Sequence, residues 1–386
     1  MQWDWMALMT LQSTYMLLLS MLKLLRIIGV NVLVFLVLVV MLELIWGDWL
    51  KLKHPLSQFN IPYGKTVEFD PRPLYANGDS IVYYTRDMNG LRGTCFSDLE
   101  EIDILTIGGS TTDQRYITDT ATWQEVLARE WWHNSGERYC IANAGLDGHS
   151  TFGHLKAMDD WILPMEELKP RYILFYIGLN DMYLEGETND DGRFRKQSVS
   201  LLQRNSVVYR SVKRMFKAQS KGRNELGHGG AELEGLEYTQ KGLMSEKQLT
   251  QLTQTKIIAY RQRLEGLITK AEKMGAKVVF VSQPSFRYIV SEEQEVKGVS
   301  LVEDKWSQQF NGMDFYNILL QMNRAMEVVA KSNGAMYINL SEMSIWDSTD
   351  FYDFMHMTPR GTKKLGKAIA RKWTPTIEKE STEGTR

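Results

Sequence analysis

The stretch DILTIGGSTT, residues 103–112, joins a short apolar strand to a glycine-rich turn and then to residues that suit the start of a helix. A strand that passes directly into a helix is typical of α/β proteins. The alternation continues along the chain, with strands predicted at 103–107, 140–143, 172–177, 277–282 and 336–339, and helices at 122–132, 151–161, 256–274, 315–332 and 361–373. The sequence therefore predicts an α/β fold with a parallel sheet that is covered by helices on both faces.

The composition is that of an ordinary folded protein and excludes several classes. Of the 386 residues, 44% are hydrophobic and 24% are charged, so the chain can bury a substantial core. The formal net charge of −2 gives no electrostatic footprint for nucleic acid, and we expect no nucleic-acid partner. The two cysteines, Cys95 and Cys140, fit no metal-binding spacing and no disulfide framework. A single disulfide between them stays open, so they do not decide the redox compartment.

The N-terminal region differs from the rest because it is almost entirely apolar. Residues 27–46 read IIGVNVLVFLVLVVMLELIW and as a helix would extend roughly 30 Å, the thickness of a bilayer core. Glu43 lies near one end of this run, and Trp46 and Trp49 suit the aromatic belt of a membrane interface. We predict a membrane anchor over 1–50. The run is too long for a buried core helix, and no small-residue cleavage site follows it, as a signal peptide would require.

The rest of the chain divides by composition into three parts, the second of which contains an insertion. We predict a β-rich connector over 51–99, where turn signals are frequent, and the main α/β domain over 100–374. Residues 217–250 are rich in Lys, Glu, Gly and Gln and are typical of a mobile insertion. Residues 375–386 are polar and predict a flexible tail.

Polar residues follow four of the predicted elements at the edge where a doubly wound sheet binds its ligands, the carboxyl ends of the strands. Because these ends meet, we expect the four segments to lie together. They are Gly108-Gly109-Ser110-Thr111-Thr112, the run from Asn143 to Ser150, Gly178-Leu179-Asn180-Asp181, and Asp353-Phe354-Met355-His356.

These segments supply every group that acyl transfer needs. Ser110, at a strand-to-helix turn, is the candidate nucleophile, and His356 is the candidate base that takes its proton. Asp353 comes three residues before His356, so in a helical turn the two side chains would share one face. The candidate donors to an oxyanion are the backbone N–H of Ser110, the backbone N–H of Gly148, with Gly145 as the alternative, and the amide of Asn180.

Each of these residues also has a plain structural interpretation. Ser110 and the Asn180-Asp181 pair could cap helices, the glycines could serve turns, and Asp353 with His356 could be a surface ion pair. Their joint appearance after the right strands favours the catalytic interpretation, with Asp181 left structural. His149 and His154 have no metal-ligand spacing, so the sequence predicts no metal and no cofactor.

The four segments, in this order, resemble the blocks of the SGNH hydrolase superfamily, the GDSL-type esterases and lipases. The resemblance covers roughly residues 100–374 and implies a flavodoxin-like three-layer α/β/α sandwich. The first block reads GGST rather than GDSL, as in a membrane-anchored bacterial subgroup. His149 stands where many members carry Asp, which would alter the rim of the substrate site and add a second imidazole near it.

The resemblance implies a serine-dependent ester hydrolase that forms an acyl-enzyme on Ser110, with O-acetyl groups of a surface glycan, or a lipid ester, as candidate substrates. An O-acyltransferase would use the same residues, beside an integral membrane acyl donor protein. An inactive, membrane-tethered binding or structural subunit is the third alternative. The resemblance also favours an extracytoplasmic catalytic domain. Charge does not orient the chain, since Lys23 and Arg26 precede the apolar run and Lys51 and Lys53 follow it.

Overall fold

The computed structural model describes residues 2–49, 54–58, 61–76, 80–184, 205–217, 226–305 and 308–375. They fall into two compact units. The first is Met1–His54 with Gln197–Gly222, and the second is Pro55–Lys196 with Arg223–Arg386. Most of the predicted flexible tail, from residue 376 on, and residues 218–225 of the predicted insertion lie outside the described residues.

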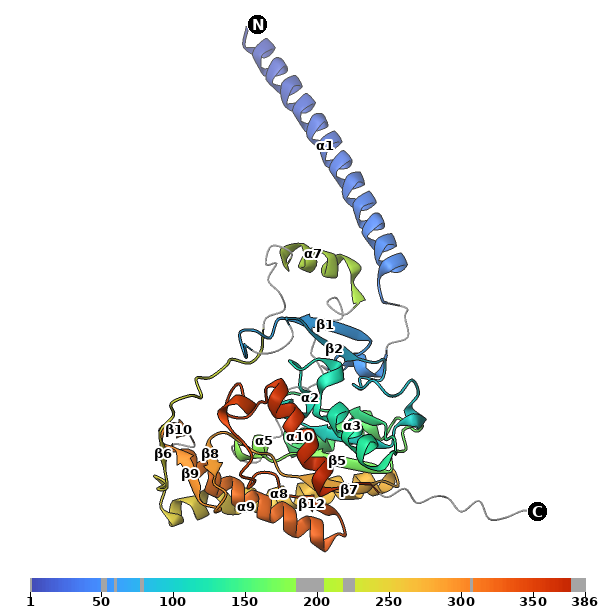
Figure 1. Ribbon diagram of the computed structural model, residues 1–386. Coiled ribbons are helices and arrows are strands. Elements are labelled where there is room, and N and C mark those ends of the chain that lie inside the picture. The colour runs from blue at the N-terminus through green and yellow to red at the C-terminus, as the bar shows by residue number, and fades with distance from the viewer. Residues whose placement is uncertain are drawn as a thin grey trace, which may run out of the picture. The chain divides into compact units, whose positions relative to one another are not determined.

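The described residues of the first unit include the helices α1 (Gln2–Trp46) and α7 (Val207–Lys217). Helix α1 is long and apolar enough to cross a membrane over Leu18–Trp46, with a mean hydropathy of 2.8 (Figure 1). The side-chain amide of Asn31, the polar interruption in this run, donates to the carbonyl oxygen of Ile27 one turn earlier, at 2.9 Å. The amide is thus hydrogen-bonded within the helix, as an apolar environment requires.

The second unit is built on a five-stranded parallel sheet. Its strands are β3 (Ile104–Gly108), β4 (Ile141–Asn143), β5 (Tyr172–Tyr176), β7 (Lys277–Val281) and β12 (Met336–Ile338). Their order is β12-β7-β5-β3-β4, and all neighbours are parallel. In chain order this is 2-1-3-4-5, the flavodoxin-like arrangement, so the predicted fold class is confirmed.

Helices cover both faces of this sheet, because alternate strand residues point to opposite sides. Ile104 and Leu174 face α3 (Trp123–Ser135) and α10 (Pro359–Lys372). Leu105 faces the opposite layer. That layer consists of α4 (Thr151–Ala157), which continues into a π-helical turn at Met158–Ile162, α8 (Glu246–Lys273) and α9 (Gly312–Ser332), and α8 packs against α9 (Figure 1).

The predicted connector is largely an integral part of the sheet unit. A 3₁₀ turn at Pro55–Gln58 leads to a hairpin of β1 (Lys65–Phe69) and β2 (Val82–Arg86), and a second 3₁₀ turn lies at Leu99–Glu101. Arg86, at the end of this hairpin, is 1% exposed, and its guanidinium reaches the carboxylate of Asp113 at 2.5 Å. A domain boundary at residue 99 would assign the two partners of this buried ion pair to different domains.

The part of the predicted mobile insertion that the structure describes, 226–250, is packed against the sheet unit. Strand β6 (Tyr238–Thr239) pairs with β9 (Val296–Val299), which also pairs with β8 (Tyr288–Val290). Helix α8 begins at Glu246, ten residues before the predicted start at 256, because Ser245 and Gln248 form a capping box. A further hairpin, β10 (Glu303–Lys305) and β11 (Gln308–Phe310), precedes α9.

Candidate active site

Ser110 is the first residue of the short helix α2 (Ser110–Asp113), directly after strand β3. The turn is held by the carbonyl oxygen of Gly109, which accepts from the N–H groups of Thr112 and Asp113 at 3.0 and 2.9 Å. A Cβ atom on Gly109 would lie 2.5 Å from the side-chain nitrogen of Asn180, so this position requires glycine. The turn presents Ser110 at the carboxyl edge of the sheet, as predicted.

His356 lies between Ser110 and Asp353. Its Nε2 atom is 2.6 Å from Ser110 Oγ, and its Nδ1 atom is 2.7 Å from Asp353 Oδ2. With the proton on Nδ1, His356 donates to the carboxylate and accepts from the serine hydroxyl. This is the geometry of a Ser-His-Asp triad.

The Asp353–His356 segment is a bend and not the helical turn that the sequence predicts. Asp353 Oδ1 accepts from the N–H groups of Met355 and His356 at 2.8 and 2.7 Å. The N–H of Tyr352 donates to the carbonyl oxygen of His356 at 3.0 Å and closes the bend. The carboxylate therefore organises the backbone that carries the imidazole as well as the imidazole itself.

The pKa of Asp353 is lower than that of an ordinary aspartate. Burial would raise it, but the hydrogen bond and charge of His356 and the two backbone N–H groups lower it further than burial raises it. Asp353 is thus a carboxylate at neutral pH. A carboxylate in this place stabilises the imidazolium that forms when His356 accepts a proton.

Asn180 lies on α5 (Leu179–Met182), after strand β5, and its Nδ2 atom donates to the carbonyl oxygen of His149 at 2.7 Å. The same amide occupies the space that a side chain at position 109, the residue before Ser110, would need. The neighbouring Asp181 instead accepts from the N–H of Thr151 and pairs with Arg263, which agrees with a structural role.

The two candidate oxyanion glycines differ in their surroundings. The N–H of Gly145 already donates to Asn143 Oδ1 at 2.8 Å, and a Cβ there would lie 2.4 Å from the backbone nitrogen of Asp113. Gly145 is therefore a packing glycine. Gly148 has a positive φ of 79°, and a Cβ there would meet nothing within 4 Å. The surroundings favour Gly148 as the backbone donor.

His149 and His154 do not lie at the rim of the site. Both are buried, and their ring centroids are 5.9 Å apart. Burial, with a smaller contribution from His149, lowers the pKa of His154 well below its ordinary value, so His154 is neutral. Within the described residues, no group of three or more His, Cys, Asp or Glu side chains is placed to hold a metal ion.

The second imidazole at the site belongs to His228, which lies in the predicted insertion and which the sequence did not indicate as a site residue. Its ring stacks on that of His356, with centroids 4.1 Å apart and planes 26° apart. Its Nδ1 atom is 2.9 Å from the hydroxyl of Tyr352, and its Nε2 atom is 3.4 Å from Asp147 Oδ1. It follows no sheet strand and belongs to no motif, so only its residue type could have drawn attention to it.

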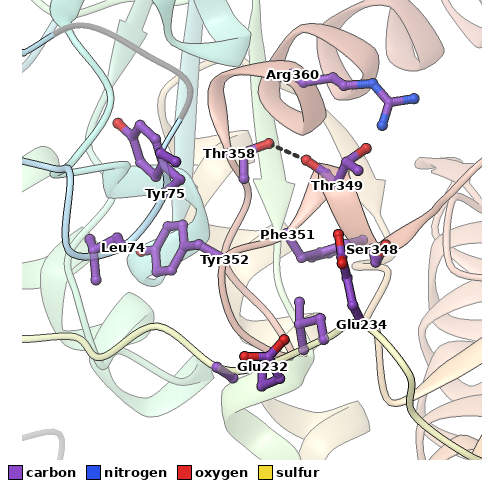
Figure 2. A pocket seen from close by; sticks show the side chains of 13 residues that line it. Leu74, Tyr75, Glu232, Glu234, Ser348, Thr349, Phe351, Tyr352, Thr358 and Arg360 are labelled. Carbon is purple, nitrogen blue, oxygen red and sulfur yellow. Dashed lines mark hydrogen bonds between the residues drawn. The ribbon is translucent and has the colours of Figure 1, made fainter.

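Tyr352 lines two cavities, and its ring lies nearly parallel to that of His356, with the ring centroids 5.5 Å apart. The cavity at Ser110 is small, about 10 Å³, and Ile117, Tyr176 and Met357 help to line it. The other cavity is about 330 Å³ and is shown in Figure 2. It combines aromatic rings with hydroxyl and charged groups, from Tyr75, Phe351, Ser348, Thr349, Glu232, Glu234 and Arg360.

No family model matches the sequence, and no curated protein matches it. Among solved structures, the chain is similar to a catalytic mutant of Axe2, an acetylxylan esterase from Geobacillus stearothermophilus, with 12% identity and a TM-score of 0.39 over 69% of this chain and 92% of that chain. It is also similar to a putative lipolytic protein of the G-D-S-L family from Desulfitobacterium hafniense, with 11% identity and a TM-score of 0.37 over 69% and 97%. The chain is likewise similar to TesA, with 12% identity and a TM-score of 0.36 over 69% of this chain and 94% of that chain.

Proposed function

We propose that the chain is a serine ester hydrolase of the SGNH type, with Ser110 as nucleophile. The observation that carries this proposal is the continuous hydrogen-bonded row from Ser110 through His356 to Asp353. A helix cap or a surface ion pair would not require a serine hydroxyl 2.6 Å from an imidazole that is itself oriented by a partly buried carboxylate.

The reaction proceeds through an acyl-enzyme. Ser110 Oγ attacks the ester carbonyl carbon as its proton passes to His356 Nε2, and the oxyanion accepts from Ser110 N–H, Gly148 N–H and Asn180. The tetrahedral intermediate expels the alcohol, which takes the proton from His356. Water then attacks the acyl-enzyme, gives a proton to His356, and releases the acid as Ser110 regains its proton.

The two cavities support a small acyl group on a larger, hydroxylated alcohol. The space of about 10 Å³ at Ser110 is roughly that of one water molecule, so it offers no room for a long acyl chain. The neighbouring cavity of about 330 Å³, with aromatic rings, hydroxyls and carboxylates, falls within the size range of ligand sites, roughly 300–1,000 Å³, and offers the groups that bind a sugar. We therefore favour O-acetyl groups of a glycan as substrate over long-chain lipid esters.

The test compares the purified wild-type chain with Ser110→Ala on an O-acetylated oligosaccharide and on p-nitrophenyl acetate and octanoate. We expect acetate release by the wild type only, and a preference for acetate over octanoate. Adding an unacetylated oligosaccharide separates the alternatives, since acetyl transfer to it would identify an acyltransferase. A folded wild-type protein without either activity would favour the inactive subunit.

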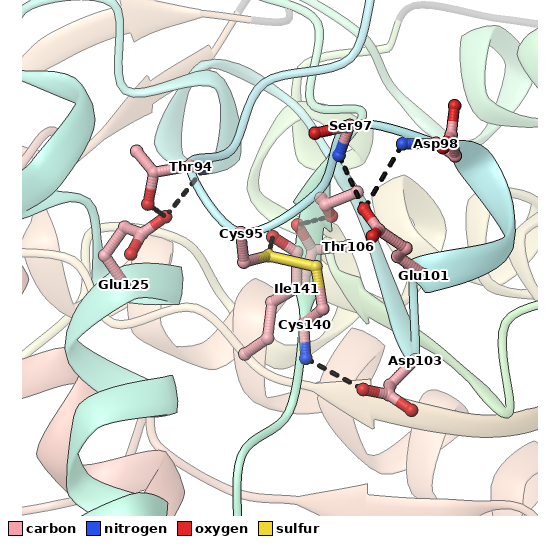
Figure 3. The surroundings of a disulfide bond; sticks show 11 residues. Thr94, Cys95, Ser97, Asp98, Glu101, Asp103, Thr106, Glu125, Cys140 and Ile141 are labelled. Carbon is pink, nitrogen blue, oxygen red and sulfur yellow. Dashed lines mark hydrogen bonds between the residues drawn. A yellow bond between two sulfur atoms is a disulfide. The ribbon is translucent and has the colours of Figure 1, made fainter.

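We further propose that α1 anchors the protein and that the catalytic unit lies on the extracytoplasmic side. The support is the disulfide between Cys95 and Cys140, whose Cα atoms are 5.4 Å apart (Figure 3). Disulfides persist in oxidising compartments and are rare in the cytosol. Protease protection of sealed membranes tests the orientation, because a catalytic unit resistant to protease from the extracytoplasmic side would contradict it.

A further inference from the structure

Helix α7 separates apolar from basic residues along its length. Its sequence is VVYRSVKRMFK, residues 207–217. At 3.6 residues per turn, Val208, Val212 and Met215 fall on one side and Arg210, Lys213 and Arg214 fall on the other. This division is typical of a helix that lies at a boundary between an apolar and a polar phase.

The apolar side of α7 is not buried among the described residues. Val212 is 46% exposed and Met215 is 74% exposed. A surface helix of a soluble domain turns such residues into its own core. Within the first unit, the described residues therefore provide no core for Val212 and Met215.

The start of α7 is fixed to the end of the candidate membrane span. Glu43, in the last turn of α1, accepts from the N–H groups of Val207 and Val208 at 3.0 and 3.1 Å and from the Ser206 hydroxyl at 2.5 Å. The carboxylate thus binds the N–H groups that a helix start leaves without partners. It also explains why an acidic residue interrupts the apolar run.

A second set of contacts supports the same junction. The N–H of Asp48 donates to the carbonyl oxygen of Asn205 at 2.9 Å, and Arg210 pairs with the Asp48 carboxylate. Trp49 Nε1 donates to Glu43 Oε2 at 2.8 Å. Polar contacts and an interfacial tryptophan thus gather where α1 would leave the bilayer, and α7 leads away from that point (Figure 1).

We infer that α7 lies in the headgroup layer of an anionic bilayer, with Val212 and Met215 toward the acyl chains and Lys213 and Arg214 toward lipid phosphates. An apolar side beside a basic side is the composition of interfacial helices, and basic residues next to a span bind anionic lipid. The inference rests on membrane insertion of α1 and is independent of ester hydrolysis. It gives the chain a second membrane attachment, located in the sequence between β5 and β7.

The test places one nitroxide label on α7 of the full chain in lipid nanodiscs. Both native cysteines are joined in the disulfide, so Met215→Cys supplies a single free thiol, with Lys213→Cys as the matched control. In discs that contain phosphatidylglycerol, we expect the label at 215 to be relaxed more by oxygen than by a water-soluble nickel complex, and the label at 213 to show the reverse. In phosphatidylcholine discs this contrast should shrink.

Three outcomes would overturn the inference. Equal exposure of both labels to nickel in anionic discs would place α7 in water. A label at 215 that neither reagent reaches would assign the apolar side to a protein partner or a second copy. If the label at 215 lies at the same depth in anionic and in phosphatidylcholine discs, the basic side does not bind anionic lipid as inferred. Failure of α1 to insert would appear separately, as protein that does not remain with the discs, and hydrolysis by the same samples reports on Ser110.

Discussion

Ser110 is an ordinary hydroxyl until a base can remove its proton, so its chemistry depends on His356 and on what holds His356. Three groups hold this imidazole. Asp353 fixes one nitrogen, and the rings of His228 and Tyr352 lie against its plane. Its orientation is thus set by packing as well as by charge.

Substitution of Asn180 distinguishes a catalytic role of its amide from a purely structural role. Asn180→Ala should lower kcat by roughly 10²–10³, because one donor to the oxyanion is lost. Steady-state kinetics on p-nitrophenyl acetate measure this. An unchanged kcat in a folded Asn180→Ala protein would exclude Asn180 from the proposed oxyanion site.

His228 is expected to position His356 through its ring. His228→Ala should lower kcat by about two- to tenfold, the rate equivalent of an aromatic contact of roughly 0.5–1.5 kcal/mol, and His228→Phe should restore most of it. Restoration by Phe would assign the effect to stacking. If kcat of His228→Phe is as low as that of His228→Ala, the effect comes from the hydrogen bonds of His228 to Tyr352 and Asp147 instead.

The elements bring together groups that are far apart in the sequence. Arg86, at the end of β2, donates to the carboxylate of Asp113 in α2 and to the carbonyl oxygen of Gly145. Burial would raise the pKa of Asp113, but the charges of Arg86 and Arg115 and the hydrogen bonds from Tyr84 and Arg86 keep it below the ordinary value. The hairpin thus supports the turn that carries Ser110.

Arg86→Ala should lower the free energy of unfolding by about 3–5 kcal/mol at pH 7, because it removes the nearest cation from a buried carboxylate and leaves only the more distant Arg115. The lowered pKa of Asp113 means that its contribution is complete above the unfolded pKa of about 4 and is lost as pH falls through the lower folded value. The difference in the free energy of unfolding between Arg86→Ala and the wild type should therefore become smaller toward pH 3. Chemical denaturation of the detergent-solubilised chain at both pH values checks this, and a constant difference would contradict it.

The sequence predicted those elements that show a clear apolar pattern. Each of the five sheet strands begins and ends within about a residue of its prediction, since parallel strands are continuous apolar runs. Helix α8 was predicted ten residues short because its first turns are polar and depend on a capping box. The bend at Asp353 could not be predicted, because it follows from side-chain hydrogen bonds to the backbone.

Contacts between segments that are far apart in the chain could not be predicted from local sequence patterns. The polar composition of 226–250 suggested mobility, but Asp314 accepts from the N–H groups of Leu243 and Met244 and fixes that segment to α9. His228 is held beside His356 by nearer contacts, since the N–H of Gly227 donates to the hydroxyl of Tyr116 and the N–H of Ala231 to the carbonyl oxygen of Tyr352. The predicted triad residues, in contrast, followed from the rule that strand ends meet at one edge of the sheet.

At the scale of the whole molecule, the disulfide joins the predicted connector to the sheet domain across 45 residues of sequence. Replacing both Cys95 and Cys140 by Ser should lower the free energy of unfolding by about 2–4 kcal/mol while leaving kcat nearly unchanged. Protein isolated from membranes should bind no thiol reagent before reduction. Two reactive thiols in such protein would contradict both the disulfide and the oxidising compartment.

The measurement that tests the central claim most directly is covalent labelling by a fluorophosphonate, followed by mass spectrometry of the labelled peptide. The wild-type chain should carry the label on Ser110, His356→Ala should label far more slowly, and Ser110→Ala should not label. A folded wild-type chain that resists the probe, or label on another residue that persists in Ser110→Ala, would contradict the assignment of Ser110 as the nucleophile.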